Sequence, residues 1–359
     1  MRRPTFLLPL LLLVAVLPTA LSAQLQITAG AADIAVGGRF HLQYSRSSVD
    51  GEGGGADAID DLFVRRARIQ LNLRMSDAFD ARVEPDFGGG GVGVGLADAW
   101  ARLTLGPGLR LSAGQFKRAF TTFELASSTD LSLIERDGRI EGLAGCPGVA
   151  SVCTFSRFTE RLQFDDRDIG VRAEGAIGSR VSYMATLTNG EGRNSADVND
   201  AKSFSGRLVV MPGGGLRVGA FAGSHDYLDR DTADQRATAF GADLELGEFR
   251  DGFHLIAGVA SGDNWRSGPD AGFTAVQGLA SFFLPLAEGG RFAGVEPLFR
   301  LSWATTENDV GEDQGALLLT PGLSVYVVGK NWIGVNLDRY DPDFAPSEWS
   351  LKVQAFAFF

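Results

Sequence analysis

The last eleven residues, WSLKVQAFAFF at positions 349–359, decide how this chain folds. Apolar and polar side chains alternate along them, and this two-residue period is typical of a β-strand with one apolar side. The final residue, Phe359, is aromatic and closes the strand. A terminal amphipathic strand that ends on an aromatic residue is typical of a transmembrane β-barrel of the bacterial outer membrane.

The other end of the chain supports export. Residues 1–23 begin with Met1, Arg2 and Arg3, continue as an apolar run to Leu17, and finish in small residues. A basic start, an apolar centre and small residues before a cleavage point predict a secretory signal peptide over 1–23. We therefore expect one mature domain over 24–359, an outer-membrane β-barrel. Its expected location is the bacterial outer membrane.

The bulk composition agrees with a barrel. After residue 23 no apolar run reaches the roughly 18 residues that a membrane helix needs. The mean hydropathy of +0.03 fits a barrel, because lipid-facing and lumen-facing residues alternate, and it fits a soluble protein equally well. The alternation is therefore the signal that discriminates. A net charge of −11 does not exclude an anion pore, because selectivity depends on the few charges that line it.

Alternating segments recur along the whole chain and predict an all-β fold, a transmembrane antiparallel barrel of about sixteen strands. The predicted strands are 34–46, 62–75, 79–88, 94–105, 108–117, 167–176, 180–189, 202–211, 215–226, 236–247, 251–261, 272–286, 291–305, 314–327, 331–340 and 348–359. Their connectors alternate short and long, as expected of periplasmic turns and external loops. The longest connector, 118–166, is the third external loop. We expect it to fold into the barrel and narrow the pore, and the alternative is a surface loop.

Period-two alternation also separates the two faces of each strand. In 62–75, Arg66, Arg68 and Arg74 share one face. A charged side chain that faces lipid at mid-depth costs about 2–4 kcal/mol, so this face must point into the lumen. Arg102 and Arg172 lie on similar polar faces. The alternative for any single arginine is neutralisation by an acid of a polar interior, such as Glu84 or Asp86 on the following strand.

Two cysteines, Cys146 and Cys153, lie close together in a Gly- and Pro-containing loop. In an exported protein such a pair predicts a disulfide. A metal site is disfavoured because the three histidines, His41, His225 and His254, are distant in sequence. The chain has no G-x-S-x-G motif and no histidine close in sequence to a candidate nucleophile, which disfavours a hydrolase. A passive barrel requires no catalysis, metal or cofactor, so we expect none.

Three stretches of the chain resemble the phosphate-selective porin O and P family. They are VRRAR at 64–68, EPDFGGG at 84–90 with LADAW at 96–100, and GQFKRAF at 114–120 running on to ELASS at 124–128 and IER at 134–136. The motif-level similarity covers about 62–192. The resemblance implies a sixteen-stranded, trimeric, anion-selective channel that passes phosphate or polyphosphate along an arginine ladder toward a lysine-containing constriction.

Carried onto this chain, the resemblance places Lys117 and Arg118 at the entrance of the constriction loop. We expect a positive, anion-binding lining made by Arg66, Arg68, Arg74, Arg102, Lys117, Arg118 and Arg172. We expect Glu124, Ser127, Ser128, Glu135 and Arg136 to hold the shape of the loop, with the two serines capping a short helix. The chain departs from the family pattern because it has no lysine between residues 120 and 166, so anion preference is expected rather than a lysine-built phosphate pocket.

The leading hypothesis is a passive, anion-preferring diffusion channel, with phosphate or polyphosphate as the best candidate solute. The expected partners are small anions, outer-membrane lipid, the barrel-assembly machinery through the C-terminal strand, and two further copies in a homotrimer, but no nucleic acid. The alternatives are a general or cation-preferring porin and a non-conducting structural or adhesive barrel. A soluble secreted β protein is the remotest alternative.

Overall fold

The computed structural model describes residues 25–30, 32–50, 59–89, 94–136, 138, 154–228, 233–287 and 289–359. The predicted signal peptide over 1–23 and the predicted disulfide between Cys146 and Cys153 lie outside the described residues. Both therefore stay predictions.

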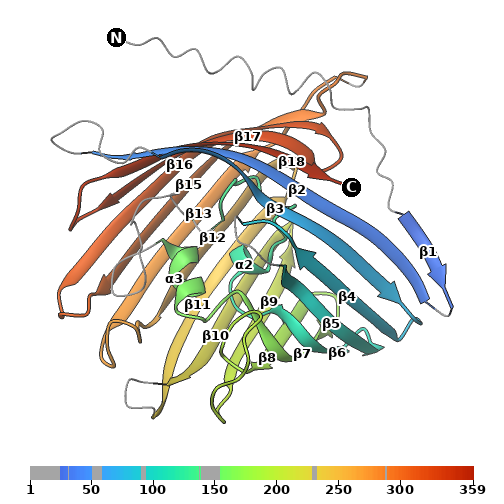
Figure 1. Ribbon diagram of the computed structural model, residues 1–359, viewed down its shortest axis with the longest axis horizontal. Coiled ribbons are helices and arrows are strands. Elements are labelled where there is room, and N and C mark those ends of the chain that lie inside the picture. Colours follow the sequence, from blue (N-terminus) through green and yellow to red (C-terminus); the bar gives the residue numbers. More distant parts are fainter. Residues whose placement is uncertain are drawn as a thin grey trace.

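Within the described residues, sixteen long antiparallel strands form one closed barrel (Figure 1). They are β2 (Ala32–Val49), β3 (Ile59–Arg74), β4 (Phe79–Asp86), β5 (Gly95–Gly106), β6 (Leu109–Lys117), β7 (Arg167–Ile177), β8 (Val181–Thr188), β9 (Ser203–Gly213), β10 (Leu216–Leu228), β11 (Asp234–Glu248), β12 (Asp251–Asp263), β13 (Gly272–Phe282), β15 (Gly294–Glu307), β16 (Asp313–Val328), β17 (Asn331–Pro342) and β18 (Glu348–Phe358). The C-terminal strand β18 pairs with β2 and closes the sheet.

Two short strands were not predicted. β1 (Leu25–Ala29) pairs with the start of β2, beside the part of β2 that β18 leaves open. β14 (Leu284–Pro285) continues β13 along β15 after a break at Phe283, so the predicted strand 272–286 is divided in two. Each of the sixteen predicted segments otherwise overlaps one strand of the barrel, and the predicted all-β antiparallel fold is confirmed.

The alternation of side chains agrees with a barrel in lipid. Along β15, Phe299, Leu301 and Trp303 point outward and remain 39–46% exposed, whereas Arg300 and Ser302 between them are buried. Apolar side chains that would be costly in water are stable against lipid, and polar ones are stable inside. No described helix is long and apolar enough to cross a membrane.

The connector between β6 and β7 folds into the barrel. It contains two short helices, α2 (Thr122–Leu125) and α3 (Phe155–Arg161), which lie within the curve of the sheet (Figure 1). α2 contacts β11 and β12, and α3 contacts β13 and β15. The described part of this third external loop therefore lies inside the barrel, as predicted, and is not a surface cap.

An apolar core holds the loop in place. Loop residues Phe120, Phe123, Phe155, Phe158 and Phe164 are buried against inward-facing apolar side chains of β10–β17. These wall residues include Phe221, Ile256, Phe273, Leu279, Leu298, Leu318 and Tyr340. Burying one phenylalanine side chain stabilises a fold by about 1.5–3 kcal/mol, so the cluster provides a strong reason for the loop to leave the surface. The open, polar side of the lumen is thereby shifted toward β2–β8.

Candidate functional site

A polar cavity of about 140 Å³ lies between the in-folded loop and the wall formed by β3 and β4. Its lining contains six arginines and five acids, together with Gly88, Gly89 and Ser156. The arginines are Arg65, Arg66, Arg68, Arg136, Arg167 and Arg193, and the acids are Asp86, Glu124, Glu135, Glu160 and Asp166. The cavity is on the long-loop side of the barrel, which corresponds to the external side of such barrels.

A β-bulge brings two consecutive arginines to this cavity. In the pairing of β2 with β3, His41 faces Arg66 and Leu42 faces Val64, so Arg65 has no partner residue across the ladder. A bulge of this kind re-aims a side chain that strict alternation would send to the other face. The Arg65 guanidinium donates to both oxygens of the Glu135 carboxylate, at 2.6 and 3.0 Å. Arg66 makes no ion pair with any described residue, and its Nε has no hydrogen-bond partner among them.

The next arginine of the predicted ladder is neutralised. Arg68 Nε donates to Asp86 at 2.6 Å, and its Nη1 donates to Glu84 at 3.1 Å. The same Glu84 oxygen accepts from Arg39 at 2.7 Å. Arg74 lies at the short-turn end of β3, is exposed, and pairs with Asp77 in the following turn. Of the three arginines in the predicted ladder, Arg66 therefore has no carboxylate partner among the described residues, and Arg68 is neutralised. Arg74 lies at the opening of the barrel on the short-turn side.

A second arginine cluster surrounds Trp100, nearer the short-turn end of the same wall. The guanidinium carbons of Arg82, Arg102 and Arg172 lie 5.7, 5.0 and 5.9 Å from the Trp100 ring centre, within the range of cation–π attraction. Arg102 also donates to both oxygens of Asp80, at 3.0 and 2.8 Å. Arg172 pairs with Glu174 at 3.3 Å. This stretch of the wall is polar, with its charges largely balanced.

The two cations at the loop entrance bind the loop backbone. Lys117 Nζ donates to the carbonyl oxygens of Glu124 and Ala126, at 2.5 and 2.9 Å. Arg118 is only 1% exposed and donates to the carbonyl oxygens of Gln163 and Ser224. Burial lowers the pKa of Arg118 to about 10, so the group stays charged at neutral pH. This burial contradicts the expected place of Arg118 in the pore lining.

The five residues expected to shape the loop have partners within or beside it. Glu124 pairs with Arg136 at 2.7 Å; burial alone would raise the pKa of this carboxyl, but Arg136 and Lys117 lower it to about 2. Arg136 also donates to the Ala126 carbonyl at 2.6 Å. The remaining contacts are Glu135 with Arg65, Ser127 with Thr129 at 2.8 Å, and Ser128 with Arg39 at 2.8 Å.

The capping role expected of the two serines is wrong. Thr121 caps α2 by accepting from the Glu124 backbone N–H at 3.2 Å, and Thr154 caps α3 by accepting from that of Arg157 at 3.4 Å. A threonine oxygen at this position satisfies an N–H that the helix itself leaves without a partner. Ser127 and Ser128 follow α2 and belong to the turn after it.

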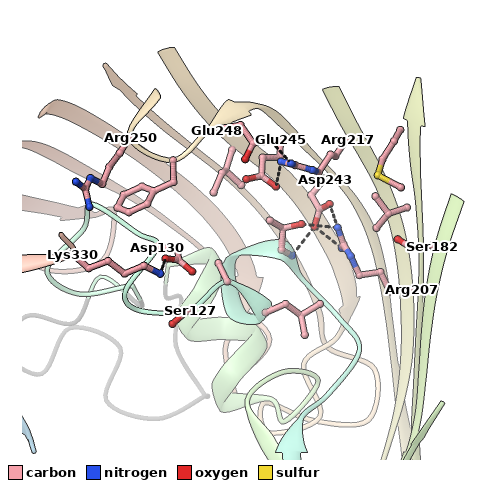
Figure 2. A pocket seen from close by; sticks show the side chains of 17 residues that line it. Ser127, Asp130, Ser182, Arg207, Arg217, Asp243, Glu245, Glu248, Arg250 and Lys330 are labelled. Atoms are coloured by element: carbon pink, nitrogen blue, oxygen red, sulfur yellow. Dashed lines mark hydrogen bonds and ion pairs between the residues drawn. The ribbon is translucent and has the colours of Figure 1, made fainter. Parts of the chain in front are cut away.

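On the short-turn side of the loop lies a larger cavity of about 740 Å³, drawn in Figure 2. Arg207 pairs with Asp243 at 2.5 Å, and Arg217 pairs with Glu245 at 3.3 Å and Glu248 at 2.5 Å. Across the cavity Lys330 pairs with Asp130 of the loop at 2.5 Å, beside Arg250 (Figure 2). Charges of both signs line this vestibule, which therefore favours hydration of small ions without a strong field of one sign.

Sequence reasoning missed four arginines that shape the lumen. Arg65 was missed because strict alternation does not allow for a bulge, and Arg167 because it is the first residue of its strand. Arg207 and Arg300 lie on the inner faces of β9 and β15, and the sequence alone does not show that they contact the loop. Among the described residues no group of three or more His, Cys, Asp or Glu side chains is arranged to hold a metal ion.

Several solved outer-membrane barrels share this fold. Solved structures with the same fold include the anion-selective porin from Comamonas acidovorans, with 15% identity, a TM-score of 0.62, and coverage of 91% of this chain and 100% of that chain. They also include the outer membrane channel DcaP of Acinetobacter baumannii, with 12% identity, a TM-score of 0.61, and coverage of 93% and 99%. OmpT of Vibrio cholerae in its trimer form has 10% identity, a TM-score of 0.58, and coverage of 91% and 99%.

At these identities the structural likeness supports the fold alone. No curated protein matches the sequence. The sequence profile of the family described as "Phosphate-selective porin O and P" matches residues 34–246, which is more than half of the chain. The chain therefore belongs to the phosphate-selective porin O and P family, and it is an outer-membrane porin.

Proposed function

We propose that this porin is a passive diffusion channel that prefers anions, with phosphate or polyphosphate as its best candidate solute. The observation that carries the proposal is Arg66. Its guanidinium lines the 140 Å³ cavity beside the in-folded loop and has no carboxylate partner among the described residues. The other β3 arginines at this depth are occupied, Arg65 by Glu135 and Arg68 by Glu84 and Asp86.

The chemistry of a guanidinium suits this role. Its planar fork of N–H donors matches two oxygens of a phosphate group, and such charge-assisted hydrogen bonds are stronger than neutral ones. Conduction also requires that the ion leave the site again. A single attractive arginine bordered by neutralised pairs binds an anion weakly enough for release, whereas several unpaired arginines would bind it too tightly. Only Arg193, at the external edge of the same cavity, adds another guanidinium with no described ion pair. We therefore expect modest anion preference.

The test uses purified protein in a planar lipid bilayer across a KCl gradient. The wild-type zero-current potential should have the sign of anion preference, and added phosphate should block the current. Arg66→Gln should move the potential toward zero and weaken the phosphate block roughly 10–100-fold, the equivalent of one charge-assisted hydrogen bond. Arg74→Gln is the matched control, because it removes the same charge from the same strand at the exposed mouth.

A cation-preferring channel is the second candidate, because acids cluster at the external rim of the barrel. A groove of about 720 Å³ on the outer face at this rim, beside the outward-facing Phe240 and Thr305, has only acids among its charged residues. These are Asp263, Asp270, Glu307, Asp313 and Asp343. The net charge of −11 acts in the same direction. A zero-current potential of the opposite sign, unchanged by Arg66→Gln, would favour this candidate. A complete lack of conductance would favour a non-conducting structural or adhesive barrel.

We also propose that the chain assembles as a homotrimer in outer-membrane lipid, and that the barrel-assembly machinery recognises its C-terminal strand. The trimer form of OmpT of Vibrio cholerae, which has the same fold, supports the first part. The apolar outer face of the barrel supports its location in lipid. Mass measurement of the detergent-solubilised protein tests the trimer. Phe359→Ala, which keeps the closing strand β18, tests recognition through a reduced yield of folded protein in the outer membrane.

A further inference from the structure

Two arginines from different parts of the wall hold the same loop residue, Glu135. Arg65 of β3 binds its carboxylate through both oxygens, at 2.6 and 3.0 Å. Arg300 of β15 binds its main-chain carbonyl oxygen at 2.8 Å, and that of the next residue, Arg136, at 3.0 Å. The side chain and the backbone of Glu135 are therefore fixed independently.

Arg300 itself is held rigidly. It is 1% exposed, and besides the two loop carbonyls it donates to Thr320 at 3.1 and 2.8 Å and to Asp338 at 3.0 Å. These contacts use all five N–H donors of the guanidinium. Asp338 is in turn bound by Lys352 of β18 at 2.5 Å. Arg300 is thus a preorganised anchor on the barrel wall, with no donor left for a passing solute.

The loop backbone around Glu135 is docked at further points. The Ile134 N–H donates to Asn336 Oδ1 at 2.8 Å, and Ser324 Oγ donates to the Ser132 carbonyl at 3.3 Å. Gly138 donates its N–H to the Glu135 carbonyl at 3.4 Å and has a φ of +68°. A Cβ added there would lie 2.5 Å from Leu318 Cδ2, so another side chain would be strained by the backbone conformation and would displace the turn or Leu318.

We infer that Arg300 is a positioning residue for ion selectivity, which keeps the Glu135 carboxylate on Arg65 and away from Arg66. This inference rests on the proposed function, because it gives Arg66 the role of the solute-binding cation. Glu135, Arg65 and Arg66 line the same cavity, and Arg65 and Arg66 are consecutive, so a small shift of the loop backbone brings the carboxylate to the second guanidinium. The anchor on β15 therefore decides which of the two arginines is neutralised.

The test is Arg300→Gln in the full-length protein, measured in the same bilayer assay. The substitution leaves Asp338 and Lys352 as a balanced pair, which favours correct folding. Anion preference should fall to about the level of Arg66→Gln, with phosphate block weakened about tenfold and single-channel conductance within twofold of wild type. The double variant R66Q/R300Q should be no worse than R66Q, because both act on one guanidinium. Lys330→Gln is the control, since it releases the loop from the wall at Asp130, on its short-turn side.

A rescue experiment separates this role from general loosening of the loop. In the Arg300→Gln background, Glu135→Gln should restore anion preference to about the wild-type value, because the carboxylate that the loop shift would bring to Arg66 is gone. Gly138→Ala provides a second variant that displaces the same turn without removing a charged group. If R66Q changes selectivity and both R300Q and G138A behave like wild type, the positioning role is overturned while the proposed function stands. If R66Q itself behaves like wild type, both are overturned.

Discussion

Asp165 accepts a hydrogen bond from the Thr121 hydroxyl at 2.5 Å, and this contact joins the two ends of the in-folded loop. Thr121 caps α2, Asp165 follows α3, and the Thr159 hydroxyl donates to the same Asp165 oxygen at 3.3 Å. Burial, reinforced by the nearby charge of Glu124, raises the pKa of the Asp165 carboxyl to about 7. The loop thus carries a buried acid that titrates near neutral pH.

The free energy of unfolding should therefore decrease as the pH rises through neutrality. An aspartate in the unfolded chain titrates near pH 3.9, so the folded protein holds this proton more tightly. The resulting stabilisation is complete below about pH 4 and is lost as the pH rises through about 7, with a total of up to about 4 kcal/mol. The unfolding midpoint in detergent should be lower at pH 8 than at pH 5, and Asp165→Asn should remove most of that difference. Asp270→Asn, in an exposed loop, should leave the difference intact.

Removal of the carboxylate that Arg39 and Arg68 share should strengthen anion preference. Glu84 is fully buried and binds both guanidinium groups, at 2.7 and 3.1 Å. Glu84→Gln leaves two buried cations undercompensated, which we expect to cost about 3–5 kcal/mol of stability. The zero-current potential should shift further toward anions. The control is Asp77→Asn, which removes an exposed acid at the short-turn mouth. A shift toward cations would contradict the assignment of this network to the pore field.

Gly114 should be important for efficient barrel formation. It has a φ of +128° within β6, and an added Cβ would lie 2.2 Å from the Ala99 carbonyl oxygen on the neighbouring strand. Gly114→Ala should reduce the yield of folded barrel several-fold, because the backbone conformation and the close strand contact both oppose a side chain. Gly278 in β13 has nothing within 4 Å of such a Cβ, so Gly278→Ala should fold normally. The folded fraction is read from the mobility of unheated protein in gels.

The aromatic core should set the width of the open channel. Phe158 of α3 stacks on Phe273 of the wall, with ring centres 5.2 Å apart. Phe158→Ala should destabilise the docked loop by about 3–5 kcal/mol and increase both the mean conductance and its fluctuations. Phe344→Ala, at an exposed position in the last loop, should change neither. Unchanged conductance in Phe158→Ala would mean that the ion path is independent of how tightly this loop packs.

Alternation along single strands predicts the strands of this barrel well, because lipid on one side and a polar lumen on the other impose a two-residue period. The same reasoning places Arg66 and Arg68 correctly on a common inner face. It does not reveal which of them is neutralised, because the partners Glu84 and Asp86 come from the next strand and their register is set by pairing. It also fails at Arg65, where one inserted residue reverses the expected side.

The inward position of the long loop was predictable from its place in the order of connectors, but its attachment was not. Five phenylalanines in a polar connector were a usable signal, because that much apolar surface is not stable in water. The predicted place of Arg118 in the pore lining is wrong, because a cation at the entrance of the loop does not have to face the solute. The loop backbone instead offers the carbonyl oxygens of Gln163 and Ser224, which such a group can satisfy.

The seam between β18 and β2 has a kinetic consequence. At this seam the side chain of Gln354 donates to that of Gln43 at 2.8 Å, across 311 positions of sequence. Closing a loop of that length costs about 5 kcal/mol of chain entropy, whereas every other pair of barrel strands joins strands that are consecutive along the chain. Until the last strand arrives, the sheet has two bare edges that can pair with another incomplete copy. Closure is therefore an all-or-none event that converts an aggregation-prone chain into a closed barrel without free strand edges.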